Sequence, residues 1–135
     1  MPTFNDPAAD AAEAQQALRG LAHATRDIDD PTQIYPVLGS LSAVAGSLGQ
    51  SLHQLAAFHD RPAPQRMRVT EEDRKGRVAE HEVSWGLHRA GEILRQVSAA
   101  LDHAHETEVL ISYDRRDAAF VPEPPRSTPN QGLSL

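Results

Sequence analysis

The strongest constraint on how this chain folds is a long segment without charge, because residues 31–59 contain no Asp, Glu, Lys or Arg. Within it, apolar residues recur at alternating spacings of four and three, which is the period of one α-helix face. The members of this stripe are Ile34, Leu38, Leu41, Ala45, Leu48, Leu52 and Leu55. A membrane span of about 20 residues would fit the length, but Gln50, His53 and Gln54 dilute the apolar run. The segment is therefore predicted to be a central helix over 32–59 that is buried on two faces.

A second face of the same segment carries the smallest side chains, at Gly39, Ser42, Gly46 and Gly49. Each glycine inside a helix costs about 1 kcal/mol relative to alanine, so a compensating close approach of another helix backbone is expected. We predict that these four residues form a helix-packing surface and the interface with a second copy. Three residues of the apolar stripe are expected to contribute to the same contact: Leu41, Leu48 and Leu52.

Two further helices are predicted from their start signals. Asp6-Pro7 offers an N-cap followed by proline at the first helical position, which predicts a helix over 7–28. The sequence TEED at 70–73 resembles a capping box and predicts a helix over 71–112. Residues 1–6 and the Pro-rich residues 114–135 are expected to be disordered, which leaves a helical domain over 7–113.

The predicted fold class is all-α. The helices over 32–59 and 71–112 would form a long antiparallel hairpin, and the helix over 7–28 would fold back on it or reach a partner. A hairpin with one strong apolar stripe per helix buries little surface alone, so a homodimeric, coiled-coil-like helical bundle is expected. A self-contained three-helix bundle is the alternative.

The sequence gives no catalytic constellation. The chain contains no Cys, no nucleophile elbow and no phosphate-binding loop. His81, His88 and Glu92 share one helix face, and so do Asp102 and His105, but the Glu-x-x-His spacing of carboxylate-bridged bundle sites is missing. We therefore expect no enzyme activity, no catalytic residue, no metal site and no cofactor.

Two features are candidate partner surfaces. Arg61, Arg66 and Arg68 belong to a basic segment over 61–77, in a chain whose net charge is −6. The segment has no aromatic residue to stack on a base, so an exposed loop is favoured over a nucleic-acid contact. Trp85 lies off the main stripe of its helix, which suits either the edge of the core or a partner surface.

The segment over 30–61 resembles small uncharacterised helical proteins of high-GC Gram-positive bacteria, often found in mobile or phage-like regions. The shared features are a proline-aspartate break, then Ile34-Tyr35, then Leu-Gly-x-Leu over 38–41, then a Leu-x-Gln-Leu helix end over 52–55. This resemblance implies a cytoplasmic helical accessory protein and carries no activity with it.

A looser likeness is to the Trp-x-Gly helical hairpins that are type VII secretion substrates. Tyr113 and Asp117 stand at the spacing of their Tyr-x-x-x-Asp/Glu export signal, after the last predicted helix. In those proteins Trp-x-Gly lies in the turn between helices, whereas here Trp85 is followed directly by Gly86 inside a helix.

The function expected from the sequence is a non-enzymatic helical protein-protein interaction module, an adaptor or accessory protein that pairs with itself or with an obligate helical partner. Its expected location is the cytoplasm. One alternative is a secreted helical hairpin recognised through Tyr113 and Asp117. Another is a nucleic-acid-associated accessory protein that uses the basic segment over 61–77.

Overall fold

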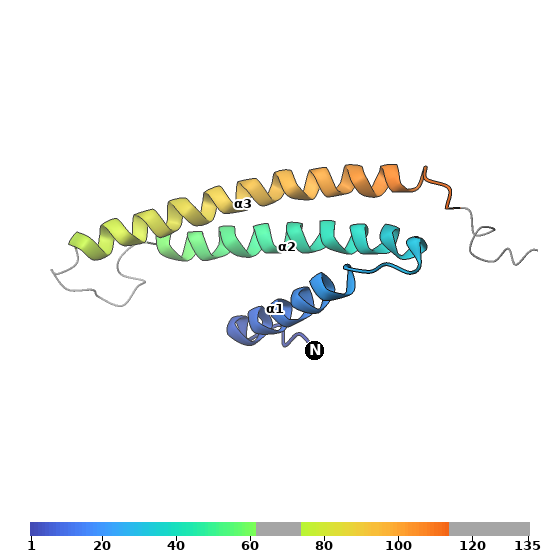
Figure 1. Ribbon diagram of the computed structural model, residues 1–135. Helices are drawn as coiled ribbons and strands as arrows, with labels where there is room; N and C mark the ends of the chain where they lie inside the picture. The colour runs from blue at the N-terminus through green and yellow to red at the C-terminus, as the bar shows by residue number, and fades with distance from the viewer. Residues whose placement is uncertain (62–73, 114–135) are drawn as a thin grey trace, which may run out of the picture.

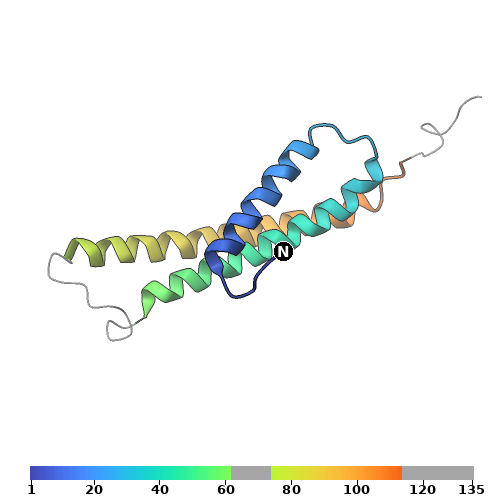
Figure 2. The same ribbon diagram turned by 90° about the horizontal axis from the view of Figure 1, so that it is seen from below.

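The computed structural model describes residues 1–61 and 74–113, and these contain three α-helices, one 3-10 turn and no β-strand. The all-α prediction is confirmed. Two long helices, α2 (Ile34–Asp60) and α3 (Arg74–Glu108), run antiparallel along each other as a hairpin (Figure 1). A shorter helix, α1 (Pro7–Ala24), lies on the far side of α2 from α3 (Figures 1 and 2). None of the helices in the described parts of the chain combines the length and apolarity needed to cross a bilayer.

Helix α1 begins at the predicted cap. The Asp6 carboxylate accepts the N–H of Ala9 at 3.1 Å, and Pro7 occupies the first turn, where its missing N–H leaves no hydrogen bond unmade. The helix ends at Ala24, earlier than the residue 28 predicted from the sequence. The Leu21 carbonyl accepts both the backbone N–H of Thr25 at 2.9 Å and the Thr25 hydroxyl at 3.0 Å, and these bonds close the last turn.

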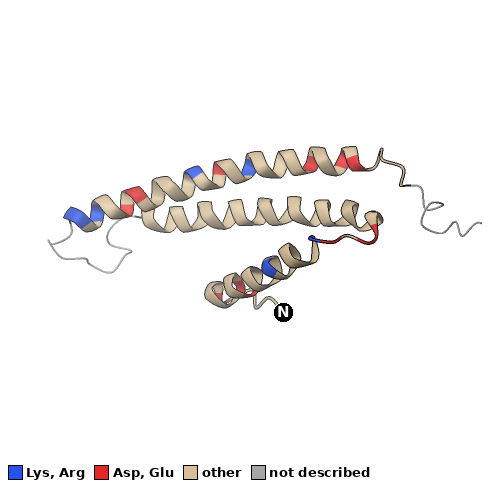
Figure 3. Ribbon diagram, viewed as in Figure 1, with Lys and Arg blue, Asp and Glu red and all other residues tan. Residues whose placement is uncertain are grey.

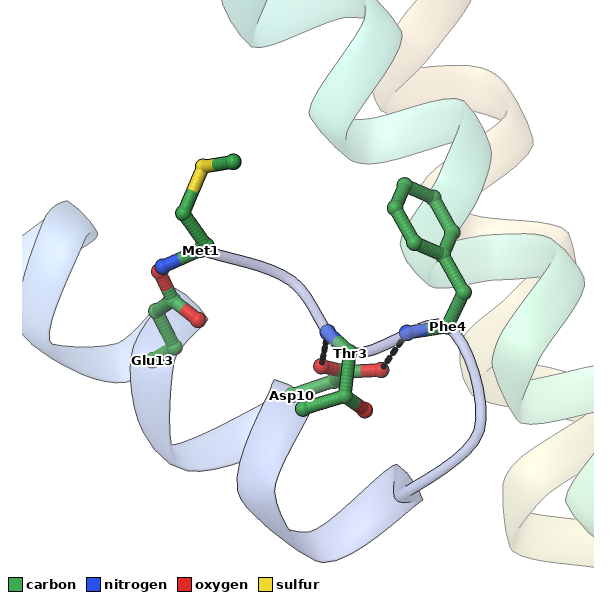
Figure 4. A network of polar contacts seen from close by, with 5 residues as sticks. All are labelled: Met1, Thr3, Phe4, Asp10 and Glu13. Carbon is green, nitrogen blue, oxygen red and sulfur yellow. Dashed lines mark hydrogen bonds and ion pairs between the residues drawn. The ribbon is translucent and has the colours of Figure 1, made fainter.

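Residues 1–6, predicted to be disordered, form a turn that folds back on α1 (Figure 4). The backbone N–H groups of Thr3 and Phe4 donate to the Asp10 carboxylate at 2.6 and 3.1 Å, and the amino group of Met1 pairs with Glu13. The hydrogen bond from the Thr3 backbone is the main cause that lowers the pKa of the Asp10 carboxyl, because it favours the ionised form.

Helix α2 follows a 3-10 turn over Pro31–Gln33, at whose start the Asp30 carboxylate accepts the Thr32 N–H at 3.0 Å. Pro36 falls in the first turn of α2, where a proline leaves no hydrogen bond unmade. The helix then runs without interruption to Asp60, so the glycines along it do not break it. With 27 residues it is about 40 Å long at the usual rise per residue.

Helix α3 contains 35 residues and is about 53 Å long. Its predicted start at residue 71 lies outside the described residues. The helix ends at Glu108 rather than at residue 112, and the N–H of Leu110 closes a tight turn on the carbonyl of Thr107 at 3.0 Å. The Tyr113 hydroxyl then donates to the Glu108 carboxylate, which holds residues 109–113 against the helix end.

The core lies entirely between α2 and α3. Within the described part of the chain, α2 packs on α3 and on the 3-10 turn, and no Cα atom of α1 comes within 8 Å of either long helix. The buried residues of the hairpin are all small: Ser42, Ala45, Gly49 and Ala56 of α2, with Ser84 and Gly91 of α3. The two long helices therefore meet along a thin seam instead of around large apolar side chains.

Candidate functional site

The small-residue seam exists because the glycines let two backbones approach. A methyl group added at Gly49 would lie 3.4 Å from the Gly91 carbonyl oxygen, and one added at Gly39 would lie 3.0 Å from the His105 ring. At Gly46 it would lie 3.8 Å from the Ser98 hydroxyl, which is ordinary contact. The sequence prediction assigned this face of α2 to a second chain. In the structure, α3 of the same chain lies against it.

Polar residues in the seam bond to each other across the two helices. The Ser42 hydroxyl donates to the Asp102 carboxylate, and the Ser98 hydroxyl donates to the Ser42 carbonyl at 3.2 Å. Buried hydroxyl groups cost free energy when unpaired, and these are paired within the hairpin. The seam is therefore satisfied internally and offers no open hydrogen-bonding groups at Ser42 for a further chain.

One side of the hairpin carries apolar residues that are exposed or half-buried in the described parts of the chain. These residues recur every three or four positions on α2 and every seven positions on α3, and we call them the leucine face: Leu41, Val44, Leu48, Leu52 and Leu55 of α2, with Val83, Ala90 and Val97 of α3. Leu48 is 44 % exposed and Leu55 is 52 % exposed. Val83 and Val97 are 45 % and 40 % exposed. This face therefore leaves several apolar side chains of the hairpin in contact with solvent.

The opposite side of the hairpin is a shallow groove of about 670 Å³. Its walls are made of small and polar side chains, which include Gly46, Gln50, Gln54, Arg95, Ala99 and Asp102. Gln50 lies about half a turn from Leu48 on α2, so the groove and the leucine face lie on opposite sides of the seam. The two sides therefore differ in chemistry, one being apolar and the other polar.

A chain of polar side chains crosses between the helices near the end of α2. The Asp60 carboxylate accepts the Ser84 hydroxyl and lies 2.9 Å from Nε2 of His88. The Nδ1 atom of His88 in turn lies 3.1 Å from the Nδ1 atom of His53, and Nε2 of His53 lies 3.7 Å from the Glu92 carboxylate. This cluster of five residues joins α2 to α3 through polar contacts.

The surroundings of Asp60 favour its ionised form. The hydrogen bond from Ser84 is the largest cause, followed by the one from His88, and together they lower the pKa of the Asp60 carboxyl below its ordinary value of 3.8. Asp60 is therefore a carboxylate throughout the neutral range, and it acts as a fixed acceptor for the His88 ring.

The predicted partner-surface residues lie outside the seam. Trp85 is 61 % exposed, and the Arg89 guanidinium lies 5.4 Å from the centre of its ring. The Arg61 guanidinium lies 5.6 Å from the Phe58 ring at the end of α2. Arg66 and Arg68 lie outside the described residues. Trp85 is therefore a surface residue and not part of the packed seam.

Of the two residues of the predicted export signal, the structure describes only Tyr113. Tyr113 is half-buried, and its hydrogen bond to Glu108 raises the pKa of its hydroxyl. Asp117 lies outside the described residues. Tyr113 therefore has a structural partner of its own at the end of α3.

The histidines considered from the sequence separate in space. His88 contacts His53 and Asp60, Asp102 accepts from Ser42, and the His105 ring stacks on Tyr35 with centroids 4.0 Å apart. In residues 1–61 and 74–113, no group of three or more His, Cys, Asp or Glu side chains is placed to hold a metal ion.

Sequence reasoning missed the Asp60–His88–His53 cluster, because its members come from two helices and the pairing depends on the hairpin register. The contacts of Gly39 with His105 and of Gly49 with Gly91 define that register. Once it is known, His53 must fall opposite His88. The signal in the sequence was the presence of His53 and Asp60 on the small-residue face of α2.

No family model, no curated protein and no solved structure matches this chain. The interpretation of function therefore depends on the geometry of the hairpin itself.

Proposed function

We propose that this protein is a non-enzymatic helical interaction module that self-associates through the leucine face of α2 and α3. The main observation behind the proposal is that one face of α2 is packed and another face is exposed. The small face is already packed against α3, whereas the leucine face is exposed on the same hairpin. We therefore propose self-association, as the sequence analysis did, but through the leucine face instead of the small-residue face of α2.

The hairpin buries little apolar surface within one chain, and this favours the proposal that a second chain covers its leucine face. The apolar residues that are buried are two alanines, Ala45 and Ala56, among the described residues. Burying one Leu or Val side chain contributes about 1.5–3 kcal/mol. Covering several residues of the leucine face would therefore add several kcal/mol of apolar stabilisation to the hairpin.

A second copy of the chain suits this face. Helix α2 has no Asp, Glu, Lys or Arg before Asp60, so two copies could meet across a two-fold axis without like charges in contact (Figure 3). Two antiparallel hairpins stacked on their apolar faces form a four-helix bundle, in which each helix buries its leucines or valines. The exposed Trp85 and Arg61 would remain outside this contact, available to a further protein.

In this proposal the protein is an adaptor or accessory protein rather than an enzyme, and it acts in the cytoplasm as expected from the sequence. The groove side of each hairpin would face outward from the four-helix bundle. Binding partners would then meet a polar surface, and self-association would use the apolar one.

The test is the absolute mass of the chain in solution, measured by light scattering on a sizing column over a hundredfold range of concentration. The chain has a mass of 14.7 kDa, and we expect about twice that mass for the native protein. Leu48→Glu should shift the mass to that of one chain, because it places a charge in the centre of the leucine face. Gln54→Glu is the matched control on the groove side and should leave the dimer intact.

Two results would contradict the proposal. One is a folded native protein with the mass of one chain at every concentration. The other is a dimer that Leu48→Glu leaves unchanged, because the contact would then lie elsewhere. Circular dichroism on each variant shows whether the helices have formed.

A further inference from the structure

The outer face of α3 points away from α2, and we propose that it binds residues 117–123 of a second copy of this chain. Ser84 and Gly91 are the buried residues of α3 and mark the side that packs on α2. The outer face lies on the other side of the helix, and we call it the tryptophan face. It consists of five exposed residues at alternating spacings of three and four: Lys75, Val78, Glu82, Trp85 and Arg89.

Two apolar side chains of the tryptophan face are open to solvent. Val78 is 59 % exposed and Trp85 is 61 % exposed. Beside Val78 the surface forms a shallow hollow of about 390 Å³, which Lys75 and Glu82 also line. Trp is among the residues that contribute most to binding between proteins when a partner covers it. The face therefore offers a place for one apolar side chain of a partner.

A cation lies at each end of this apolar part. Lys75 comes before Val78, and Arg89 follows Trp85, with its guanidinium 5.4 Å from the centre of the Trp85 ring. A guanidinium has five N–H donors, so Arg89 can bind a carboxylate while it lies over the ring. The two cations are 14 residues apart, which is about 21 Å along a helix. A ligand that fits this face has two carboxylates at that separation and an apolar side chain between them.

The segment over 117–123, DAAFVPE, has this pattern. These residues lie outside the described part of the chain. Asp117 and Glu123 provide a carboxylate at each end, and Phe120 is midway between them. The six residue steps from Asp117 to Glu123 span about 20–22 Å in an extended chain, which matches the separation of the two cations. Pro122 favours such an extended backbone.

The bound segment gives each charge of the tryptophan face a partner. With one carboxylate at Lys75 and the other at Arg89, the Phe120 ring falls in the middle of the face, beside Trp85. Glu82 lies at the same level on α3. Its carboxylate can accept backbone N–H groups of the segment, because an extended chain does not use these groups internally. The negative charge of Glu82 therefore does not oppose binding.

The residues before the segment determine its direction. Arg115 and Arg116 precede Asp117, and the exposed Glu92 lies about one turn beyond Arg89 on α3. With Asp117 at Arg89, the two arginines meet the carboxylate of Glu92. In the opposite direction they would meet the cations at the start of α3, and like charges repel. The segment is therefore expected to run antiparallel to α3.

The bound segment must come from a second copy. The Tyr113 hydroxyl donates to the Glu108 carboxylate, so residue 113 lies beside the end of α3. Trp85 is 23 residues before Glu108, which is about 35 Å along the helix. The seven residues from Tyr113 to Phe120 reach at most about 25 Å. Phe120 of the same chain is therefore too far away to cover Trp85.

The test is the binding of a fluorescein-labelled synthetic peptide of residues 114–126 to the full-length chain, followed by fluorescence anisotropy. We expect saturable binding below about 1 mM peptide. The peptide variant Phe120→Ser should bind at least about fivefold more weakly, and so should a peptide of the same composition in scrambled order. In the chain, Arg89→Glu should weaken binding at least about threefold. Arg19→Glu makes the same charge change on α1, away from this face, and should leave binding unchanged.

A second readout uses the native chain without any substitution. Trp85 is its single Trp, and the peptide has none, so the Trp emission reports on this face. Unlabelled peptide should shift that emission to shorter wavelength, because the Phe120 ring replaces water beside the indole.

Three results would overturn the proposal. One is a native chain that does not bind the peptide at about 1 mM. Another is equally tight binding of the Phe120→Ser or scrambled peptide, and the third is a Trp emission that does not shift. The peptide variants leave the fold of the chain untouched, so these outcomes are independent of folding. Leu48→Glu should bind the peptide as the native chain does, which separates this contact from the proposed self-association.

Discussion

At the scale of single residues, Gly91 is the position where a methyl group would matter most. A Cβ atom there would lie 2.6 Å from Nε2 of His53, so the His53 ring would have to shift away from α3. Gly91→Ala should therefore destabilise the hairpin by about 1–3 kcal/mol, the usual range for overpacking. Gly86→Ala on the same helix is the control. Nothing lies within 4 Å of its added methyl group, so the better helix propensity should stabilise by up to about 1 kcal/mol.

Urea unfolding followed by circular dichroism measures both changes. Equal stability of the Gly91→Ala and Gly86→Ala variants would show that the close contact at Gly91 contributes nothing to the hairpin.

The lowered pKa of Asp60 predicts how stability depends on acidity. A carboxyl group whose pKa is lower in the folded chain than in the unfolded chain stabilises the fold above its ordinary pKa of 3.8, and this contribution is lost as the pH falls through the lower, folded value. The native chain should therefore be more stable than Asp60→Asn at about pH 5, and the difference should shrink towards about pH 3. Urea unfolding over that range measures the difference. A gap that stays constant with pH would mean that Asp60 does not titrate differently in the two states.

At the scale of elements, α1 is separate from the hairpin, and its cap should act on it alone. Asp6→Ala removes the acceptor for the Ala9 N–H and should cost α1 about 1 kcal/mol. Because no Cα atom of α1 comes within 8 Å of α2 or α3, the hairpin should be unaffected. Hydrogen exchange measured by mass spectrometry should show faster exchange in 7–24 and unchanged exchange in α2 and α3. Faster exchange in α2 as well would show that the two units are coupled.

The elements show how far sequence reasoning reaches. The all-α class followed from periodicity, and Asp6-Pro7 and Pro36 marked helix starts through chemistry that is local to one turn. The ends of α1 and α3 were predicted too late, since Thr25 and the turn at Leu110 close the helices by contacts that the apolar period does not encode.

The assignment of the two faces of α2 could not be made from one sequence. The leucine stripe holds more apolar area, which suggested the core, but the glycines and serines permit the closer backbone approach that the structure uses. The choice between these faces depends on the residues of α3 that lie opposite, Gly91 and Ser98 among them, and hence on a register that no local signal sets. The same register brings His53 to His88.

At the scale of the whole molecule, self-association should make stability depend on concentration. If the folded chains are paired through the leucine face, the midpoint of thermal unfolding rises with total protein concentration by mass action. Leu48→Glu should remove this dependence, and Gln54→Glu should keep it. Differential scanning fluorimetry at several concentrations is sufficient. A midpoint independent of concentration in the native chain would argue for a hairpin that is stable alone.

The separation of α1 from the hairpin has a further consequence. The short connection between Ala24 and Pro31 acts as a tether, and a short tether holds its two ends at an effective concentration of about millimolar. Contacts of Leu18 or Leu21 that would be far too weak between free molecules become significant at that local concentration. A surface next to the hairpin, such as one on a second copy of the chain, would therefore have α1 close by as an additional binding element. If the proposed self-association forms, its avidity would depend on the length of this connection as well as on the leucine face.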